Sequence, residues 1–455
     1  MSQLHKKLSY YTIFTDEIGE NNSSRIIFST RSARAVVVSK RVYNALLQNQ
    51  WQKLSKTLIA NLIKEGILVD EEENELSKII DENKKFINDD TVLYQVIQPS
   101  AMCQLGCDYC GQDHKKVNIK DELIEKLILR YRQKLVQRPN FYSGIFIAWF
   151  GGEPLMALRE IRILTQKLKE LALEFKISYG AKIVTNGLSL KPTIFRELAL
   201  DLDIRSMEIT LDGTAEYHDV RRITKEGYDT FDIIFKNLTE IFGMPDYSSL
   251  GCSISIRCNV DKRNYLGVTP LIKKMADNDF NKFITNFYVA SVYSWGNDAH
   301  LKSFSKEEFS EMEIDWMVDQ YQHGFMPNLL PSRVKTVCLA VNPSNEMVDA
   351  YGNLFNCTEV SYVDVYKDTS YVLGNVKFDR PDEEYKDRPL VNWNDEILDN
   401  KFQCNSCKML PVCGGGCPKS WHEDMRACPT NKFNIKEKLL LSYVLTKSNI
   451  KEVTA

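Results

Sequence analysis

The chain has 455 residues, a formal net charge of -3 and a sequence pI near 6.2. This length allows two or three domains with cores of their own, and the balanced charge does not suggest nucleic acid or anionic lipid as a partner. No segment approaches the roughly 18 apolar residues of a membrane helix, and the first residues lack the pattern of a secretion signal. We therefore expect a cytoplasmic protein.

Residues 1–90 are expected to form a separate small unit. RIIFSTRSARAVVVS holds two runs typical of strands, and residues 39–50 and 54–66 place apolar side chains at helical spacing before a short strand. The pattern resembles the winged-helix element that recognises leader peptides in enzymes modifying ribosomally made peptides. A domain that serves only packing explains it equally well. The charged residues 73–90 suit a linker helix.

From residue 91 onward, strand and helix patterns alternate. Such alternation predicts an α/β domain with a parallel sheet, here a partial (β/α)6 barrel similar to a TIM barrel, whose chemistry lies at the C-terminal ends of the strands. The expected strands cover residues 92–97, 144–150, 181–185, 206–211, 252–260 and 283–292, with helical patterns between them such as 121–136, 159–175 and 228–242.

The chain has twelve cysteines, and their distribution is uneven. In a reducing compartment they favour metal ligation or catalysis over a disulfide framework. The first of them is Cys103, and the stretch AMCQLGCDYCGQDH places Cys103, Cys107 and Cys110 directly after the first barrel strand. A tetrahedral zinc site would need four protein ligands and a redox dithiol only C-x-x-C, so three thiolates in one loop fit better a 4Fe-4S cluster with one open iron.

This stretch resembles the signature of the radical S-adenosylmethionine (SAM) superfamily, including the aromatic residue, Tyr109, before the third cysteine. The resemblance implies that SAM binds the open iron and is reductively cleaved to a 5′-deoxyadenosyl radical, which takes hydrogen from an unreactive carbon. It makes Cys103, Cys107 and Cys110 the catalytic cluster ligands. An electron donor such as flavodoxin or ferredoxin is implied as a partner.

Three more segments agree with the resemblance, because GGEP (residues 151–154), TNG (185–187) and TLDG (210–213) end the next three strands. The family's GGE segment hydrogen-bonds the SAM amine, and its fourth strand contacts the ribose. Asp212 also suits an ordinary Asp-Gly turn. The resemblance implies a SAM pocket made by Tyr109, Gly151, Gly152, Glu153, Thr185, Asn186, Thr210 and Asp212.

The tail carries seven further cysteines, in the order C-x13-G-x4-C, C-x2-C-x5-C-x3-C and a last cysteine. A zinc ribbon would explain C-x2-C alone. The full order resembles the SPASM extension of radical SAM enzymes, which holds auxiliary 4Fe-4S clusters, so three clusters are expected in all. Family correspondence assigns Cys404, Cys407, Cys413 and Cys428 to an outer cluster, and Cys338, Cys357 and Cys417 to an inner one.

The inner cluster is then one thiolate short. Either a distant residue fills the place or one iron is open to the substrate, and the open site is our working hypothesis. Cys252 and Cys258 share one face of a strand and are expected to be small core residues. His114 and His218 are expected to be packing or surface residues, and His422 is a fallback ligand. Arg257 and Asn259 are placed to reach SAM.

The sequence thus predicts a winged-helix-like leader-recognition domain (1–90), a radical SAM partial barrel (91–320), a SPASM domain (321–430) and a C-terminal helix (431–455). The expected function is maturation of a ribosomally made precursor peptide with a leader by a thioether or carbon-carbon crosslink. Alternatives are an anaerobic sulfatase-maturing enzyme that generates formylglycine, and a non-catalytic iron-sulfur module. A short precursor encoded next to this chain would identify the substrate.

Overall fold

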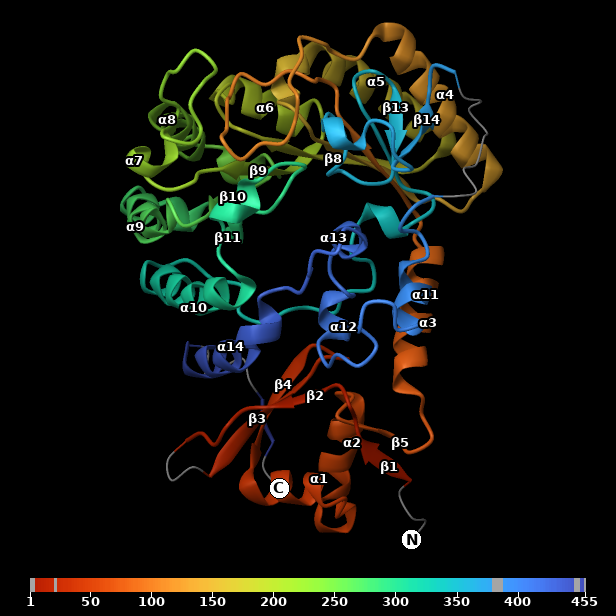
Figure 1. Ribbon diagram of the computed structural model, residues 1–455, viewed down its shortest axis with the longest axis vertical. Coiled ribbons are helices and arrows are strands. Elements are labelled where there is room, and N and C mark those ends of the chain that lie inside the picture. The colour runs from red at the N-terminus through yellow and green to blue at the C-terminus, as the bar shows by residue number, and fades with distance from the viewer. Residues whose placement is uncertain (1–4, 20–22, 379–387, 446–450, 454–455) are drawn as a thin grey trace.

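The computed structural model describes residues 5–19, 23–378, 388–445 and 451–453. The molecule is elongated, with the N-terminal unit at one end, the α/β barrel at the other and the helices of residues 393–422 between them (Figure 1). None of the helices in these ranges is long and apolar enough to cross a membrane.

The barrel contains six parallel strands that lie side by side in chain order, which confirms the predicted fold class. They are β6 (Val92–Ile97), β7 (Gly144–Trp149), β8 (Ser178–Thr185), β9 (Ile204–Thr210), β10 (Ser253–Val260) and β11 (Asn286–Ser291). Between and after them come α4 (Asp121–Gln137), α5 (Leu158–Phe175), α6 (Pro192–Leu200), α7 (Ala215–His218), α8 (Phe231–Phe242), α9 (Val268–Asp277) and α10 (Lys306–Gln322). Apolar residues of the strands and of the covering helices share one large core.

The cysteine-rich segment extends this same sheet. β12 (Glu346–Val348) pairs in parallel with β6, and β13 (Asn353–Phe355) and β14 (Val372–Asn375) follow as antiparallel neighbours, giving nine strands in one sheet. The segment continues through α11 (Trp393–Leu398), α12 (Leu410–Cys413) and α13 (Pro418–His422). The pairing of β12 with β6 was not expected from the sequence, and it makes the start of the extension continuous with the barrel.

The N-terminal unit combines strands of two small sheets with three α-helices in the described residues. β2 (Thr12–Phe14), β3 (Ser24–Ser29) and β4 (Arg34–Ser39) form antiparallel pairs, while β1 (Lys6–Leu8) pairs with β5 (Leu68–Asp70). Ser39 and Ser55 cap α1 (Lys40–Leu47) and α2 (Lys56–Lys64) by accepting hydrogen bonds from backbone N–H groups. α3 (Glu75–Asn88) runs from this unit to the barrel and packs against α11 (Figure 1).

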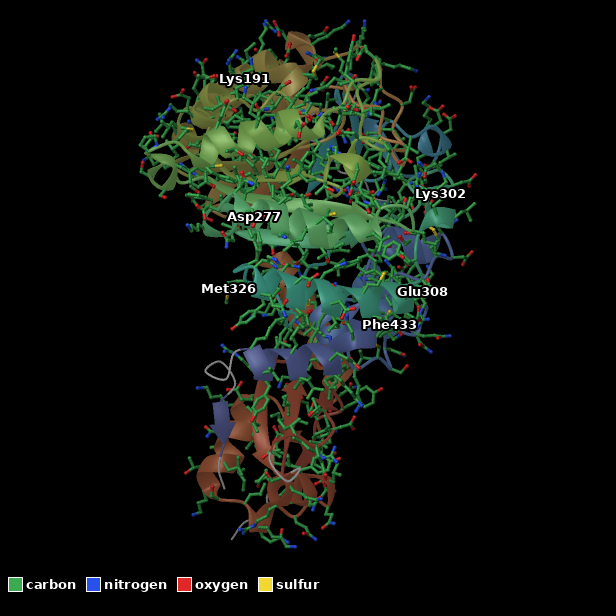
Figure 2. The ribbon with its side chains drawn as sticks, turned by 90° about the vertical axis from the view of Figure 1, so that its left-hand side faces the viewer. Lys191, Asp277, Lys302, Glu308, Met326 and Phe433 are labelled. Carbon is green, nitrogen blue, oxygen red and sulfur yellow. The ribbon has the colours of Figure 1, made fainter. Side chains whose placement is uncertain are left out.

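The C-terminal residues differ from the helix expected over 431–455. Helix α14 covers Asn431–Leu445, and β15 (Lys451–Val453) is a strand that pairs in parallel with β4 of the N-terminal sheet. α10 packs against both α9 and α14. The side view shows these helices stacked between the barrel and the N-terminal unit, marked by Asp277 on α9, Glu308 on α10 and Phe433 on α14 (Figure 2).

Candidate active site and cysteine centres

A cavity of about 260 Å³ lies at the C-terminal ends of the barrel strands. The thiols expected to bind a cluster, Cys103, Cys107 and Cys110, all line it. Most of the predicted SAM pocket lines it too, namely Tyr109, Gly151, Gly152, Glu153, Thr185, Asn186 and Thr210. The fold therefore brings together residues from a loop and three strand ends that are more than a hundred positions apart in the sequence.

The loop with the three cysteines is held at both of its ends. Ser100 forms a bridge with Asn118, and the Ser100 hydroxyl donates to the Asn118 amide oxygen at 2.7 Å. In the middle of the loop, the N–H of Gly106 donates to the carbonyl of Ile223, and the N–H of Asp108 donates to that of Arg221. The segment after β9 thus fixes the position of the cysteines by backbone contacts, which do not depend on side-chain identity.

The glycine pair after β7 passes close to this loop. Gly151 and Gly152 have φ values of +75° and +52°, which favour glycine. A Cβ atom on Gly152 would lie 2.5 Å from the carbonyl oxygen of Met102, next to the first cysteine. The backbone N–H of Gly152 donates a hydrogen bond to the side-chain oxygen of Gln112 at 3.1 Å. Only residues without a side chain allow this turn to approach the cysteine loop so closely.

Glu153 joins two of the predicted pocket segments. It is 1% exposed, and its carboxylate accepts hydrogen bonds from the Thr185 hydroxyl and the Asn186 N–H, both at 2.7 Å. Burial raises the pKa of Glu153, while these donors act in the opposite direction. The Asn186 side-chain amide also lies 3.8 Å from Cys103 Sγ. Glu153 therefore holds the end of β8 against the cysteine loop.

Asp212 is placed behind the cavity wall. Its side chain is fully buried and accepts hydrogen bonds from Tyr109 Oη at 2.6 Å and from the N–H of Asn259 at 2.8 Å. Arg222 and the Asn259 amide donate to the same Tyr109 oxygen, at 2.5 and 3.1 Å. The structure therefore shows Asp212 as an acceptor that orients Tyr109, the aromatic residue before the third cysteine.

Some residues that line the cavity lie outside the sequence motifs. Arg257 and Asn259 on β10 were candidates and do line the cavity. Arg222, Glu208, Tyr293, Trp295, Thr358 and Glu359 line it without having been predicted. Arg222 follows a helix rather than a strand, and Thr358 and Glu359 come from the cysteine-rich segment, so only the three-dimensional fold reveals them.

Backbone N–H groups point at cysteine sulfurs in a recurring way. The N–H two residues further on lowers the pKa of Cys103, Cys110, Cys338, Cys357 and Cys413, against the larger effect of burial. For Cys413 the donor is Gly415, at 3.3 Å. Such donors stabilise thiolates and tune iron-sulfur clusters. At least one cysteine in each of the three expected centres thus has a backbone N–H group nearby that favours the thiolate form.

Burial disfavours the thiolate form of these cysteines in the absence of a metal. It raises the pKa of Cys103 to about 11 and that of Cys107 to about 12, so neither would be a thiolate at neutral pH without a nearby cation. Arg222 lowers the pKa of both but does not outweigh burial. Iron supplies the charge that keeps such thiols deprotonated. The donors present therefore fit a cluster.

The four cysteines expected at the outer centre share one cavity. Cys404, Cys407, Cys413 and Cys428 line a space of about 660 Å³ between α12, α13 and the loops around them. Burial raises the pKa of Cys404 to about 11 and that of Cys413 to about 12. The Lys432 ammonium lies 3.5 Å from Cys428 Sγ. This arrangement of four thiols around one cavity is able to hold a complete cluster.

Two cysteines of the expected inner set, Cys338 and Cys417, line a cavity of about 400 Å³ together with Cys413 of the outer set. The charges of Cys338 and Cys417 each raise the pKa of Cys357, and Cys417 does the same to Cys338. Within the described ranges, no three histidine, cysteine, aspartate or glutamate side chains converge as ligands of a single metal ion. The inner set offers three sulfurs and needs another ligand or an exchangeable one.

The remaining candidates have other roles. Cys252 and Cys258 are buried in the barrel core. His218 is buried, accepts from the Asp212 N–H and contacts the Thr230 hydroxyl. His422 pairs with Glu396 at 2.8 Å. His114 lines the cavity at the strand ends, with Nε2 3.9 Å from Cys110 Sγ.

Comparison with known proteins agrees with this geometry. Residues 97–244 match the model of the Radical SAM superfamily. A serine-type anaerobic sulfatase-maturating enzyme of Bacteroides thetaiotaomicron is 22% identical over 368 residues, covering 72% of this chain and 83% of the relative.

Two solved structures are also similar. The structure of anSMEcpe with bound AdoMet and the Kp18Cys peptide has a TM-score of 0.57 and 19% identity, covering 78% of this chain and 98% of that one. Streptococcus suis SuiB bound to precursor peptide SuiA has a TM-score of 0.49 and 16% identity, covering 93% and 98%.

The matched residues include the three-cysteine loop and the strand ends that make the cavity. The chain thus contains a radical SAM domain over residues 97–244, and a cysteine-rich segment follows its barrel.

Proposed function

We propose that Cys103, Cys107 and Cys110 hold the SAM-binding 4Fe-4S cluster and that the cavity beside them binds SAM. The observation that carries this proposal is that the three thiols line one cavity at the strand ends together with Glu153. The Glu153 carboxylate binds Thr185 and Asn186 there. When bound, the reduced cluster supplies the electron that splits SAM into methionine and a 5′-deoxyadenosyl radical, which takes hydrogen from a substrate carbon.

The surrounding residues have distinct tasks in this proposal. The glycine turn at residues 151–152 brings backbone next to the cysteine loop, and Glu153 keeps Thr185 and Asn186 in position. Tyr109 stands against the cavity because Asp212, Arg222 and Asn259 hold its hydroxyl. Trp295 and Tyr293 cover the side toward the cysteine-rich extension and help to exclude water.

We further propose two auxiliary clusters. The outer one is held by the four thiols around the 660 Å³ cavity, Cys404, Cys407, Cys413 and Cys428. The inner one is held by Cys338, Cys357 and Cys417, of which Cys338 and Cys417 share a cavity with Cys413 of the outer set. This closeness suits electron transfer between the two auxiliary clusters.

The substrate that we propose is a ribosomally made peptide with a leader, which the enzyme crosslinks through a thioether or a carbon-carbon bond. A crosslink removes a pair of hydrogens: one leaves in 5′-deoxyadenosine, and the other leaves as a proton together with an electron that the extension can accept. The similar structure that binds a peptide supports a peptide substrate. The flavodoxin- or ferredoxin-like donor expected from the family would reduce the first cluster.

The N-terminal unit supports a leader-binding role by its position. Tyr10 Oη donates to the carbonyl of Ser406 at 2.5 Å, and the Thr30 hydroxyl donates to that of Lys408 at 2.6 Å. The Lys408 ammonium donates to the carbonyl of Thr12 in return. The unit is thus attached to the loop of the outer cysteines, where a bound leader would be tethered to the enzyme throughout the reaction.

Generation of formylglycine is the second candidate function. This candidate is favoured by the similarity to the serine-type anaerobic sulfatase-maturating enzyme of Bacteroides thetaiotaomicron, which covers 72% of this chain. A domain of about 90 residues in front of the barrel is not needed to oxidise one side chain, and it favours the peptide maturase.

The first test is incubation of the anaerobically reconstituted, reduced protein with SAM and a precursor peptide. We expect 5′-deoxyadenosine and a peptide lighter by about two hydrogens, as radical crosslinking chemistry requires. An aldehyde-reactive hydrazide separates the two candidates, since it labels formylglycine but not a crosslink. Protein that makes no 5′-deoxyadenosine would refute both.

The variant C103A should lose 5′-deoxyadenosine formation and keep the iron of the auxiliary centres. C252A is the matched control, because Cys252 is a buried cysteine of the core. It should keep both the iron content and the cleavage of SAM.

A further inference from the structure

One sulfur of the outer cysteine set is in contact with a lysine. The Lys432 ammonium donates a hydrogen bond to Cys428 Sγ at 3.5 Å, and both residues line the cavity of about 660 Å³ that the four outer thiols share. The two residues are four positions apart, and the backbone N–H of Lys432 donates to the carbonyl of Pro429 at 3.0 Å. This turn at the start of α14 brings the ammonium to the sulfur.

The charge of Lys432 is not neutralised by a carboxylate. Two other cations line the same cavity, and each has an acidic partner: Lys401 pairs with Glu396 at 2.7 Å, and Arg426 pairs with Glu307 at 3.5 Å. Among the described residues, no aspartate or glutamate forms an ion pair with Lys432. Its positive charge therefore acts on the thiols of the outer set.

The contact is also specific to this set. Other cysteine sulfurs have uncharged donors, such as the Asn186 amide at 3.8 Å from Cys103 and the Gly415 N–H at 3.3 Å from Cys413. In the part of the chain that the structure describes, no second lysine donates to a cysteine sulfur. An effect of a lysine charge at a ligand sulfur is thus confined to the outer centre.

The physical effect of such a contact has a defined direction. Reduction adds one negative charge to an iron-sulfur cluster, and a nearby cation stabilises the reduced form more than the oxidised form. A hydrogen bond to a ligand sulfur acts in the same direction, and both are established determinants of cluster potentials. The Lys432 ammonium supplies the charge and the hydrogen bond together.

We propose that Lys432 raises the reduction potential of the outer cluster and so favours this cluster as the acceptor of the electron that crosslinking releases. The inference rests on the proposed outer cluster. The product radical gives up one proton and one electron, the outer cluster takes up that electron, and Lys432 keeps its own proton. The electron then leaves to an oxidised one-electron carrier of the flavodoxin or ferredoxin class.

The test is a redox titration followed by electron paramagnetic resonance. The parent protein is the full chain with C103A, C107A and C110A, which removes the cluster that binds SAM and leaves the two auxiliary clusters. The signal that changes in C404A is assigned to the outer cluster. At the potential where this cluster is half reduced in the parent, K432M should show a ratio of reduced to oxidised cluster about tenfold lower. This ratio corresponds to about 59 mV for one electron.

Three variants separate the charge of Lys432 from its bulk. K432R keeps a cation and a donor and should restore most of the ratio, whereas K432Q keeps a donor without the charge and should fall between the parent and K432M. K436M is the matched control, because Lys436 is an exposed lysine of the same helix. It should titrate as the parent, and the signal of the inner cluster should keep its midpoint in every variant.

Several results would overturn the proposal. They are an unchanged outer midpoint in K432M at full iron content, equal shifts in K432M and K432R, and an equal shift in K436M. Loss of the outer iron in both K432M and K432Q would also overturn it, since Lys432 would then be needed to hold the cluster. A parent with about four irons instead of about eight would refute the outer cluster itself. SAM cleavage is not a readout here, so a failure of the proposed reaction is seen separately, in the wild-type assay.

Discussion

Arg130 on α4 of the barrel donates two parallel hydrogen bonds to Glu346 on β12 of the extension, at 2.9 and 2.8 Å. Both side chains are almost completely buried, with exposed fractions of 3% and 2%. Lys134 and Arg388 also approach the same carboxylate, at 3.2 and 3.5 Å. One glutamate thus joins the cysteine-rich extension to the barrel at the strand where their sheets merge.

Replacing this glutamate should strongly destabilise the protein. E346Q leaves buried cations without their anion, which typically costs about 3–5 kcal/mol. Chemical denaturation of wild type and variant at equal iron content measures the difference. E174Q is a suitable control, because Glu174 and Arg132 form an exposed ion pair. Its loss should lower the free energy of unfolding by less than about 1 kcal/mol. Equal losses in both variants would contradict the role given to Glu346.

The penalty of E346Q should also depend on pH in a defined direction. The cations lower the pKa of Glu346 from 4.5 to about 2 in the folded state, against the effect of burial. A lowered carboxyl pKa stabilises the fold at pH values above 4.5 and loses this effect as the pH falls toward 2. The difference between wild type and E346Q should therefore be constant from pH 8 to about pH 5.5 and shrink below about pH 4.5. A difference that grows in acid would contradict this prediction.

The glycine turn predicts a specific loss of SAM binding. G152A places a Cβ 2.5 Å from the Met102 carbonyl at a φ of +52°, so the turn must move away from the cysteine loop. Strain of this kind costs about 1–3 kcal/mol, and we expect SAM affinity to fall by about 10-fold or more. G227A is the control, because Gly227 also has a positive φ, of +87°, but a Cβ there meets nothing within 4 Å. Equilibrium SAM binding measures both.

The tyrosine before the third cysteine predicts a milder effect. Y109F removes the hydroxyl that donates to Asp212 and accepts from Arg222 and Asn259. Without this hydroxyl, the buried groups of Asp212, Arg222 and Asn259 lose a hydrogen-bond partner, which costs about 1–3 kcal/mol. The ring of residue 109 is then held less firmly, so SAM cleavage should slow while iron stays bound. Y228F is the control, because the Tyr228 ring is 70% exposed. Undiminished cleavage in Y109F would show that its hydroxyl does not position the site.

Local patterns predicted the parts of this molecule that are local. Hydrophobic periodicity predicts the six barrel strands, and the short spacing of the cysteines predicts the thiols of the cavity. Both patterns lie within a few neighbouring residues and do not depend on distant parts of the chain. The pairing of β12 with β6 and of β15 with β4 could not be predicted, because these strands are short and their partners lie hundreds of residues away. Asp212 shows the same limit: its motif marks the end of a strand, and only packing directs its carboxylate to Tyr109.

The pairing of β15 with β4 has a consequence for how the protein folds. Lys451 lies opposite Val36, so the small N-terminal sheet gains its outer strand only after the barrel and the cysteine-rich segment have been synthesised. Contacts of such long range form slowly, and until then the edge of β4 is open to any extended chain. A fusion joined after β15 would therefore begin beside β4 of the N-terminal unit.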